Sequence, residues 1–295
     1  MPAYLGRPGA LQSLPATGLK VETGLLRVSG SANTIGGGRV RDYVGTNVLR
    51  TWALRWNVLD RALYGALEAF FAGLNGPGPF AFLEPGRTNL LTANQSGATS
   101  VTNGVEGFTA AGVGELLSSS STVVERGPRS LAWALPAAPG GVLTVDAPTT
   151  DWLGIPVVPG RQYRFQCRVR GGGTDPVLDL AAKLRWADAA NVQVQLDTGA
   201  TVTTSAGAFA TATAAAICPA GSVWLVPRLV ATPATVTAPA TVFVDRPQLA
   251  MPDALDDGTV WRPGLGVPRV SLPQLDDAYW WASLHRSGLV LEEVS

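Results

Sequence analysis

Apolar and polar side chains alternate strictly along residues 50–56. Trp52, Leu54 and Trp56 point to one side of an extended chain, and smaller or polar residues point to the other. A period of two is the pattern of a strand that is buried on one face. A second strand is predicted at residues 80–83, which are again mostly large and apolar.

Between these strands the apolar period lengthens to three and four residues, which predicts a helix. Asn57 is a suitable N-cap, and Asp60 would lie near the positive end of the helix dipole. The apolar stripe of this helix consists of Leu59, Leu63, Leu67, Phe70, Phe71 and Leu74. Glycines and prolines at 76–79 end it, because proline cannot continue the hydrogen-bond ladder. We expect a helix pinned across a sheet, without chemistry of its own.

Two more strands are expected on either side of a glycine-rich turn. The first covers residues 24–30, the turn covers residues 31–38, and the second strand begins with residues 39–44. The triple glycine at 36–38 matches neither GxGxxG nor GxxxxGK[ST], the two patterns of phosphate-binding loops, and no helix is predicted after it. The segment is therefore interpreted as a flexible hairpin tip rather than a phosphate site.

Short strands separated by proline and glycine turns fill residues 130–249. The apolar faces of three of them are Tyr163, Phe165, Cys167 and Val169, then Leu178, Leu180, Ala182, Leu184 and Trp186, and then Val192, Val194 and Leu196. Two further strands are predicted at 222–231 and 241–249. Many short alternating strands of this kind predict a β-sandwich or jelly roll.

The C-terminal part is too short to form a domain alone. Strands are predicted at residues 267–272 and 289–294, on either side of an aromatic cluster at 279–281. We expect these strands to complete the sheet begun by residues 24–56.

The predicted fold is therefore mainly β, with two domains in 295 residues. Residues 1–88 and 258–295 would form one domain, a β-sheet or sandwich with a single pinned helix. Residues 92–250 would form a β-sandwich inserted into it.

Charge excludes several classes of partner. The 22 basic and 22 acidic residues balance, and charged residues make up only 15% of the chain, so no nucleic acid or anionic membrane is implied. No apolar run is long enough to span a bilayer. The N-terminus lacks the basic start and apolar core of a signal peptide, so we expect the chain to fold in a cytoplasm.

Catalytic patterns are scarce. His285 is the single histidine, which excludes a histidine-rich metal site within one chain and favours a packed or interfacial role. The nucleophile elbow GxSxG is absent, and the aspartates of the second half are scattered. We expect no enzyme, although a carboxylate pair for glycoside hydrolysis could still assemble in space. Cys167 and Cys218 are interpreted as buried thiols in preference to a disulfide.

Several short motifs lie near the two ends of the chain. The opening motifs are Gly36-Gly37-Gly38-Arg39, Arg41-Asp42-Tyr43, Arg50-Thr51-Trp52 with Trp56, Gly78-Pro79-Phe80, Glu84-Pro85 and Asn89-Leu90-Leu91. The closing motifs are Trp261-Arg262-Pro263-Gly264, Gly266-Val267-Pro268-Arg269-Val270 and Leu289-Val290-Leu291-Glu292-Glu293-Val294. These motifs resemble those of the minor tail proteins of long-tailed phages of actinobacteria.

A second set of motifs lies between them. They are Val157-Val158-Pro159-Gly160-Arg161-Gln162-Tyr163, Cys218-Pro219-Ala220-Gly221 and Val242-Phe243-Val244-Asp245. By these motifs, residues 152–249 resemble a carbohydrate-binding module of the jelly-roll kind.

The resemblance implies a structural virion protein of the tail tip or baseplate, similar to distal tail proteins. In such proteins the first domain forms a homo-oligomeric ring, usually a hexamer, under the last ring of the tail tube. Its partners would be the tail tube protein and the tail hub or fibre proteins. The inserted module would project outward, where host cell-surface glycans are candidate ligands. Carbohydrate-binding jelly rolls often hold a structural Ca²⁺, for which the sequence names no ligands.

Sugar recognition needs aromatic rings that stack on pyranose faces. The candidates are Trp152, Trp186 and Trp224, with Tyr163 as an outsider. Trp152 follows Asp151 in a loop and is the one most expected to be exposed, whereas Trp186 and Tyr163 fall on faces assigned to the core. A module that binds no sugar is the competing interpretation.

Three functions follow from these observations. The first is a structural virion component, the second a glycan-binding host-adhesion protein, and the third a polysaccharide-degrading enzyme. The first two are compatible if the inserted module binds.

Overall fold

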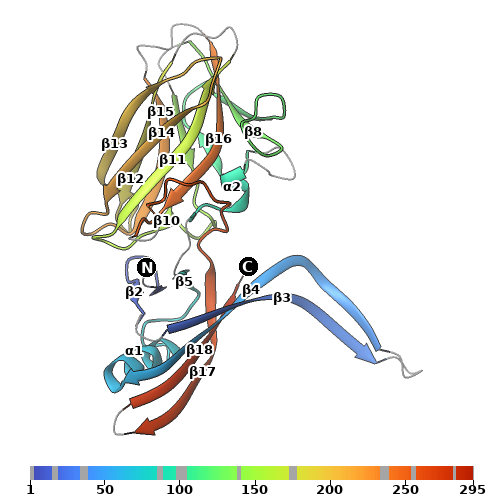
Figure 1. Ribbon diagram of the computed structural model, residues 1–295, viewed down its shortest axis with the longest axis vertical. Coiled ribbons are helices and arrows are strands. Elements are labelled where there is room, and N and C mark those ends of the chain that lie inside the picture. The colour runs from blue at the N-terminus through green and yellow to red at the C-terminus, as the bar shows by residue number, and fades with distance from the viewer. Residues whose placement is uncertain are drawn as a thin grey trace. The chain divides into compact units, whose positions relative to one another are not determined.

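The computed structural model describes residues 3–14, 19–33, 39–84, 89–97, 105–137, 141–172, 178–232, 239–253, 257–281 and 284–294. For residues 25–33, 39–48, 60, 63, 276–281 and 284–286 it describes the backbone alone. The chain divides into two compact units (Figure 1). The discontinuous unit combines Pro2–Glu84 with Pro268–Ser295, and the sandwich unit is Pro85–Val267. The segment 258–267, which the sequence analysis assigned to the first domain, thus belongs to the sandwich unit.

The discontinuous unit is built on one antiparallel seven-stranded sheet. In spatial order its strands are β2 (Gln12–Ser13), β1 (Tyr4–Gly6), β5 (Phe80–Leu83), β17 (Arg269–Trp281), β18 (Leu284–Glu293), β4 (Arg39–Asp60) and β3 (Leu19–Asn33). Leu54 of β4 pairs with Leu289 of β18. This pairing confirms that the C-terminal strands complete the sheet begun near the N-terminus. Residues 279–281 lie within β17 rather than between two strands.

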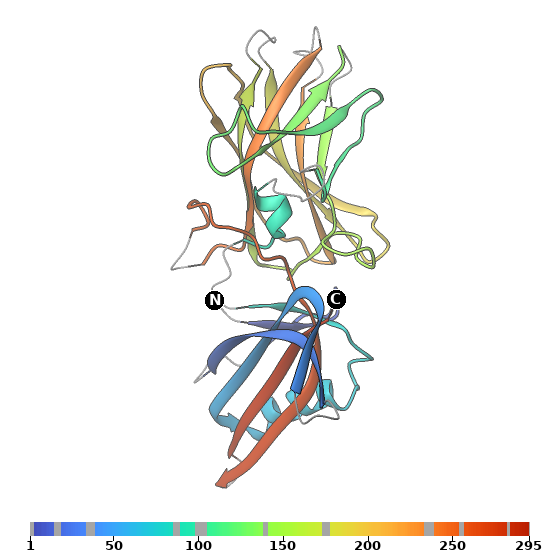
Figure 2. The ribbon, with the colours of Figure 1, turned by 90° about the vertical axis from the view of Figure 1, so that its right-hand side faces the viewer.

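The predicted alternation at 50–56 is confirmed. Trp52, Leu54 and Trp56 are fully buried, and they belong to one core with residues of β5, β18 and the helix α1 (Arg61–Phe71). Phe82 meets Trp52 edge to face, with 5.4 Å between the ring centroids. Figure 2 shows α1 against one face of the sheet.

The helix begins later than predicted. Strand β4 continues to Asp60, because Leu59 still pairs with residue 285 of β18, so Asn57 lies in a strand and caps nothing. Leu67 and Phe70 are buried as predicted, whereas Phe71 is 49% exposed and Leu74 is 80% exposed. Phe71 lies one residue, or about 100° around the helix, from the buried Phe70. Leu74 follows the helix end, where Gly73 has φ 74°. The side chain of Leu63 lies outside the described residues.

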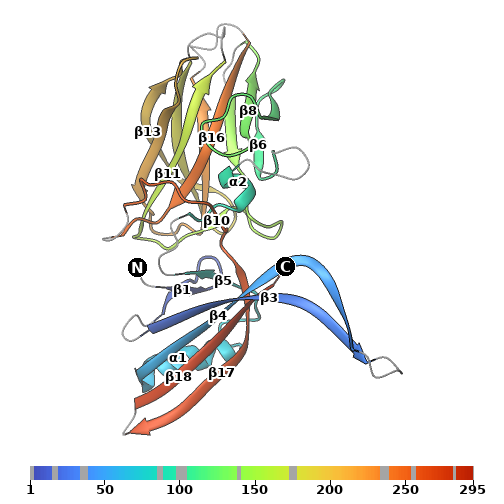
Figure 3. The same cartoon turned by 45° about the vertical axis from the view of Figure 1, so that its right-hand side comes forward.

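Strands β3 and β4 form a hairpin that continues beyond the rest of the sheet (Figures 1 and 3). They pair as far as Asn33 and Arg39, whereas β18 pairs with β4 only between Thr51 and Asp60. At the point of departure, the Arg50 guanidinium binds the carboxylate of Glu293, with 2.5 Å between Nη2 and Oε1. The outer part of the hairpin, residues 25–33 with 39–50, is called the arm below. Residues 31–33 of the predicted turn belong to β3, and the rest of the predicted turn, including the triple glycine, lies outside the described residues.

The sandwich unit contains two antiparallel sheets. The six-stranded sheet has the order β13 (Gln193–Thr203), β12 (Asp179–Ala187), β15 (Trp224–Ala231), β9 (Gly141–Val145) and β6 (Phe108–Ala110), with β10 (Ile155–Pro156) also paired to β15. The five-stranded sheet has the order β14 (Ala210–Ile217), β11 (Gln162–Gly171), β16 (Ala240–Ala250), β8 (Ser130–Leu135) and β7 (Leu116–Ser120). A short helix, α2 (Ala93–Gly97), lies beside β16 (Figure 3).

The inner faces of β11 and β12 are those that the alternation predicted. Their inward residues are buried, namely Tyr163, Phe165, Cys167, Val169, Leu180, Ala182, Leu184 and Trp186. Tyr163 and Trp186 meet edge to face between the sheets, with ring centroids 5.7 Å apart.

The apolar face predicted for the third strand is exposed. Val192, Val194 and Leu196 are 61%, 43% and 38% exposed. Leu196 of β13 pairs with Arg185 of β12, and residues paired across an antiparallel ladder share one face. That face is the outer one of the six-stranded sheet, on which β13 is the edge strand.

A substitution in α1 tests how the helix is oriented. Leu67→Asp should lower the free energy of unfolding of the discontinuous unit by about 3 kcal/mol or more, because it buries an unpaired carboxylate. Glu68→Ala, at the neighbouring exposed position, should change it by less than about 0.5 kcal/mol. Urea denaturation of both variants is the measurement. Equal effects would show that the buried face of α1 is wrongly assigned.

Candidate functional site

The outer face of the five-stranded sheet is partly covered by segments that come from three places in the sequence. These are α2 with the residues before it, the loop at 123–128, and the segment at 257–267. The charged and amide side chains of β11 and β16 meet these segments, so the face carries the candidate site of the sandwich unit.

Asn89 fixes the first and the last of these segments to β16. Its side-chain amide donates to the carbonyls of Arg262 at 2.8 Å and Pro247 at 3.4 Å. Its Oδ1 accepts from the backbone N–H groups of Leu91 and Leu249, both at 3.1 Å. Asn89 is 2% exposed, so all four bonds form away from water.

Gln248 makes a second buried set of contacts to the 257–267 segment. Its Oε1 accepts from the Arg262 N–H at 3.3 Å, and its Nε2 donates to the Gly258 carbonyl at 3.4 Å. Gln166 of β11 donates to the Thr259 carbonyl at 2.9 Å. These bonds hold the backbone on both sides of Trp261.

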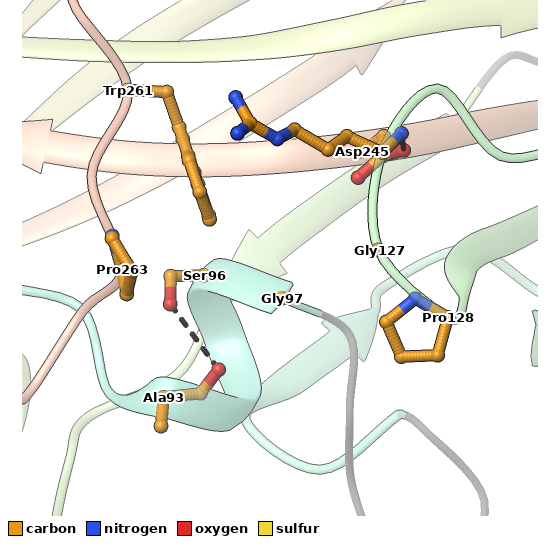
Figure 4. A pocket seen from close by; sticks show the side chains of 9 residues that line it. Ala93, Ser96, Gly97, Gly127, Pro128, Asp245, Trp261 and Pro263 are labelled. Atoms are coloured by element: carbon orange, nitrogen blue, oxygen red, sulfur yellow. Dashed lines mark hydrogen bonds between the residues drawn. The ribbon is translucent and has the colours of Figure 1, made fainter.

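Helix α2 begins with a capping box that the sequence analysis did not recognise. The Thr92 hydroxyl accepts from the Gln95 N–H at 3.2 Å, and the Gln95 side chain accepts from the Thr92 N–H at 3.0 Å. This T-x-x-Q pattern is a helix-start signal. The box orients Ser96, whose hydroxyl donates to the Ala93 carbonyl (Figure 4) and accepts from the Gly264 N–H at 2.8 Å.

Strand β16 is irregular where it crosses this face. Its pairing with β11 shifts between Gln166 and Arg168, so residues 246 and 247 form a bulge. Arg246 has φ 48°, a left-handed conformation that is uncommon for a residue other than glycine. Such bulges re-aim side chains and are frequent beside functional sites.

Asp245, at the start of the bulge, organises the loop above it. Its Oδ2 accepts from the backbone N–H groups of Glu125 at 2.8 Å and Arg126 at 3.1 Å. Its Oδ1 accepts from the Arg246 N–H at 2.8 Å. The carboxylate is 2% exposed and is held by backbone donors.

Glu125 links the loop to two arginines. The Nε of Arg168 lies 2.9 Å from Oε1 and 3.0 Å from Oε2 of Glu125, and the Nη2 of Arg168 lies 2.7 Å from Oε1. Arg168 also donates to the Phe209 carbonyl at 2.7 Å and to the Thr211 hydroxyl. The Nε of Arg246 lies 3.5 Å from Glu125 Oε2. Glu125 is therefore shared between two cations.

Two cavities of the sandwich unit adjoin at Trp261, whose side chain lines both. The larger, of about 390 Å³, is lined by Arg126, Asp245 and Ser96, and otherwise by Trp261 and by alanine, glycine and proline residues. Figure 4 shows this cavity with Asp245 and Trp261 labelled. The smaller, of about 290 Å³, is lined mainly by polar side chains, among them Glu125, Arg168 and Arg246. We call the two together the Trp261 groove. An aromatic wall beside fixed polar groups is the usual composition of a small-ligand site.

The tryptophans predicted to bind sugar lie elsewhere. Trp152 is 8% exposed and Trp224 is 6% exposed, and their rings pack together with centroids 6.4 Å apart. The expected exposure of Trp152 is wrong, because Pro156 pairs with Trp224 and thereby draws the preceding loop onto β15. Trp186 is fully buried and donates to Asp197 at 2.6 Å. None of the three lines the Trp261 groove.

Cysteine and metal chemistry have little support among the described residues. Cys167 and Cys218 are both free and buried, and burial raises the pKa of each thiol to about 12. Within the described part, no group of three or more His, Cys, Asp or Glu residues could hold a metal ion. The side chain of His285 lies outside the described residues. No helix in the described part is long and apolar enough to cross a membrane.

Comparisons with known proteins give distant structural likenesses. No protein-family model matches the chain, and no curated protein matches it. The chain is similar to the CBM22-1 xylan-binding domain of Paenibacillus barcinonensis Xyn10C, at 17% identity and a TM-score of 0.43, over 56% of this chain and 96% of that one. It is also similar to the C-terminal family 22 carbohydrate-binding module of Clostridium thermocellum Xyn10B, at 18% identity and a TM-score of 0.42. This likeness covers 58% of this chain and 99% of that one.

A third likeness is to the enzymatically active domain of tailspike protein 4 of bacteriophage CBA120, at 12% identity and a TM-score of 0.36, over 53% of this chain and 22% of that one. At these identities and TM-scores, no ligand or activity is carried over from these proteins to this chain. The resemblance to minor tail proteins stays a prediction.

Asp245 provides a test of how the groove is held. Asp245→Asn leaves one oxygen to serve three N–H donors, so we expect the free energy of unfolding of the sandwich unit to fall by about 1–3 kcal/mol. Asp257→Asn is the control, because Asp257 is exposed and its carboxylate accepts hydrogen bonds from the N–H and hydroxyl of the nearby Thr259. Thermal and urea unfolding of both variants are the measurements. If Asp245→Asn were as stable as the control, the carboxylate would not organise the loop.

Proposed function

We propose that the sandwich unit is a glycan-binding module, and that the discontinuous unit assembles copies of the chain at the tip of a phage tail. The chain would then be a structural virion protein that contacts host-surface glycans. The observation that carries the binding half is the partly exposed Trp261 indole, which lines two adjoining cavities with polar side chains in both.

The composition of the groove suits a sugar. A pyranose ring offers an apolar face of C–H groups to an aromatic ring, while its hydroxyls require donors and acceptors at the rim. Trp261 provides the ring, and the guanidinium and carboxylate groups around the bulge provide the polar partners. The largest cavity of the pair has a volume within the range of small-ligand sites.

The groove is also held in place before any ligand arrives. Asn89, Gln248 and Ser96 fix the backbone on both sides of Trp261 through buried hydrogen bonds. A site that is ordered in advance loses less conformational entropy on binding. This arrangement favours recognition by a rigid surface.

The carboxylates of the groove favour binding over hydrolysis. A glycosidase needs one carboxyl group to donate a proton and another to attack or activate water. Asp245 already accepts three backbone N–H groups, and Glu125 is bound by Arg168 and approached by Arg246. We therefore propose a binding module without catalysis, and release of reducing sugar from a bound polysaccharide would contradict this.

A pair of tryptophan substitutions tests the groove. Trp261→Ala should weaken glycan binding by about 2 kcal/mol or more while leaving the melting temperature nearly unchanged. Trp152→Ala is the matched control, because it removes a buried indole and should lower the free energy of unfolding by about 3–5 kcal/mol. Below its melting temperature the Trp152 variant should bind as the natural protein does.

Both variants are to be compared on a glycan array and by pull-down with bacterial cell-wall polysaccharide. Loss of binding in the Trp152 variant alone, with binding retained in the Trp261 variant, would place the site away from the groove. Failure of the unaltered protein to bind any glycan would overturn the binding half of the proposal.

The assembly half is favoured by the arm of the discontinuous unit. Among the described residues, the two strands of the arm pair only with each other, and an isolated two-stranded hairpin is marginally stable in water. A surface of a neighbouring copy would stabilise the arm. In the described part of the sheet β3 is the last strand, so its outer edge offers backbone groups that could pair with another chain. We propose a ring of copies, six by the family resemblance, that contacts the tail tube and the tail hub or fibre proteins.

Shortening the arm tests assembly. Replacing residues 26–49 by Asn-Gly closes a two-residue hairpin between the paired residues Leu25 and Arg50. We expect the full chain to form closed oligomers in mass photometry and negative-stain images, and the shortened chain to remain a folded monomer. A full chain that stays monomeric at micromolar concentration, or a shortened chain that still forms rings, would contradict the role of the arm.

A further inference from the structure

We propose that the ligand of the Trp261 groove is an acidic glycan, whose sugar carboxylate pairs with Arg126. This inference rests on the proposed glycan-binding function and specifies its substrate class. It follows from the hydrogen-bonding capacity that the groove leaves unused.

The two acidic side chains of the groove are already engaged. The Asp245 carboxylate faces the N–H groups of Glu125, Arg126 and Arg246, and the Glu125 carboxylate is bound by Arg168. Neither forms an ion pair with the Arg126 guanidinium among the described residues. Arg126 is exposed, and its backbone N–H, rather than its side chain, makes the contact with Asp245.

The remaining walls of the larger cavity do not compensate this charge. Ser96 donates to the Ala93 carbonyl and accepts from the Gly264 N–H, so its hydroxyl is occupied. The other wall residues are alanine, glycine and proline, together with Trp261. The charged groups of this lining are Arg126 and Asp245. Three backbone N–H groups hold the Asp245 carboxylate, whereas no described side chain forms an ion pair with the Arg126 guanidinium.

Two further hydrogen-bond donors in the walls of the Trp261 groove have no hydrogen-bond acceptor among the described residues. The indole Nε1 of Trp261 is buried and has no acceptor within the described residues. The Nε of Arg246 also lacks a hydrogen-bond acceptor there, although Glu125 is 3.5 Å away. A carboxylate is an acceptor-only group, and it pairs with guanidinium through two parallel bonds. The groove therefore favours a ligand that brings acceptors and negative charge.

A uronic acid combines both requirements. Its ring presents an apolar face for Trp261, and its carboxylate projects from the ring edge, where a guanidinium beside the indole would meet it. A neutral sugar would satisfy the aromatic wall and leave the charge of Arg126 unpaired. A glycan with phosphate groups would supply the same charge, so the experiment separates the two anions.

The test compares three polymers by isothermal titration calorimetry with the full chain. They are polygalacturonate, the same polymer after chemical reduction of its carboxyl groups, and polyglycerol phosphate. We expect polygalacturonate to bind at least about tenfold more tightly than the reduced polymer, as for a charge-assisted bond, and to weaken as salt is raised. Arg126→Gln should abolish this preference without changing affinity for the reduced polymer.

Arg129→Gln is the matched control, because Arg129 lies on the same loop and is exposed but donates to Ser119 outside the groove. It should retain the full preference. An equal loss in both variants would indicate non-specific attraction to positive charge and would overturn the assignment to Arg126. If polyglycerol phosphate were the one polymer that bound, and Arg126→Gln abolished that binding, the carboxylate assignment would be overturned in favour of a phosphate.

The outcomes separate this inference from the function on which it rests. Equal binding of the charged and reduced polymers, with loss in Trp261→Ala, would overturn the acidic-glycan inference and leave glycan binding intact. Failure of the unaltered chain to bind any of the three polymers would overturn the inference, while the glycan array decides the broader function.

Discussion

The candidate site depends on two amide side chains that cannot be left unpaired. Asn89 and Gln248 are buried, and a buried polar group without a partner costs about 1–3 kcal/mol. Their partners are backbone groups of the 257–267 segment and of β16, which are distant from Asn89 in sequence. The segment is therefore bound to the sandwich at Arg262, next to Trp261. The position of the indole follows from the need to satisfy these amides.

The topology of the discontinuous unit explains how a sandwich of this size is accommodated. The chain leaves after β5 and returns at β17, and these strands are neighbours, with Phe80 paired to Val270. The Phe82 N–H also donates to the Pro268 carbonyl at 3.1 Å. The hydrogen-bonded pairing of β5 with β17 thus fixes both ends of the insertion. The insertion interrupts the sequence of the sheet without removing any of its pairings.

Local sequence patterns predicted which residues share a face, and tertiary pairing decided the rest. The alternation in β11 and β12 identified the buried sides correctly, because both strands lie inside their sheets. The same alternation in β13 could not show that its apolar side faces outward on an edge strand. Asn57 has the chemistry of an N-cap, yet the ladder with β18 continues through it, since each added pair satisfies backbone groups of both strands.

The site was harder to predict than the fold, because its parts are far apart in sequence. The T-x-x-Q pattern at Thr92–Gln95 is a local helix-start signal, and it indicates the start of α2 from the sequence alone. Trp261 was quoted only as part of a family motif, and no local pattern connects it with Asn89 or with the β16 bulge. The position of Trp152 in a loop predicts exposure, but the pairing of Pro156 with Trp224 holds this loop against the core.

The division of the chain has a consequence for binding strength. Asn89, Glu125, Asp245 and Trp261 all belong to the sandwich unit, so a single copy contains the whole candidate site. If the discontinuous unit gathers several copies, each further contact with a repeating polysaccharide occurs at a raised effective concentration. A groove of modest affinity is then sufficient for firm attachment, and release of any single site remains fast. Under the proposed function, recognition would then depend on the two sheets of the sandwich unit and assembly on the separate sheet of the discontinuous unit.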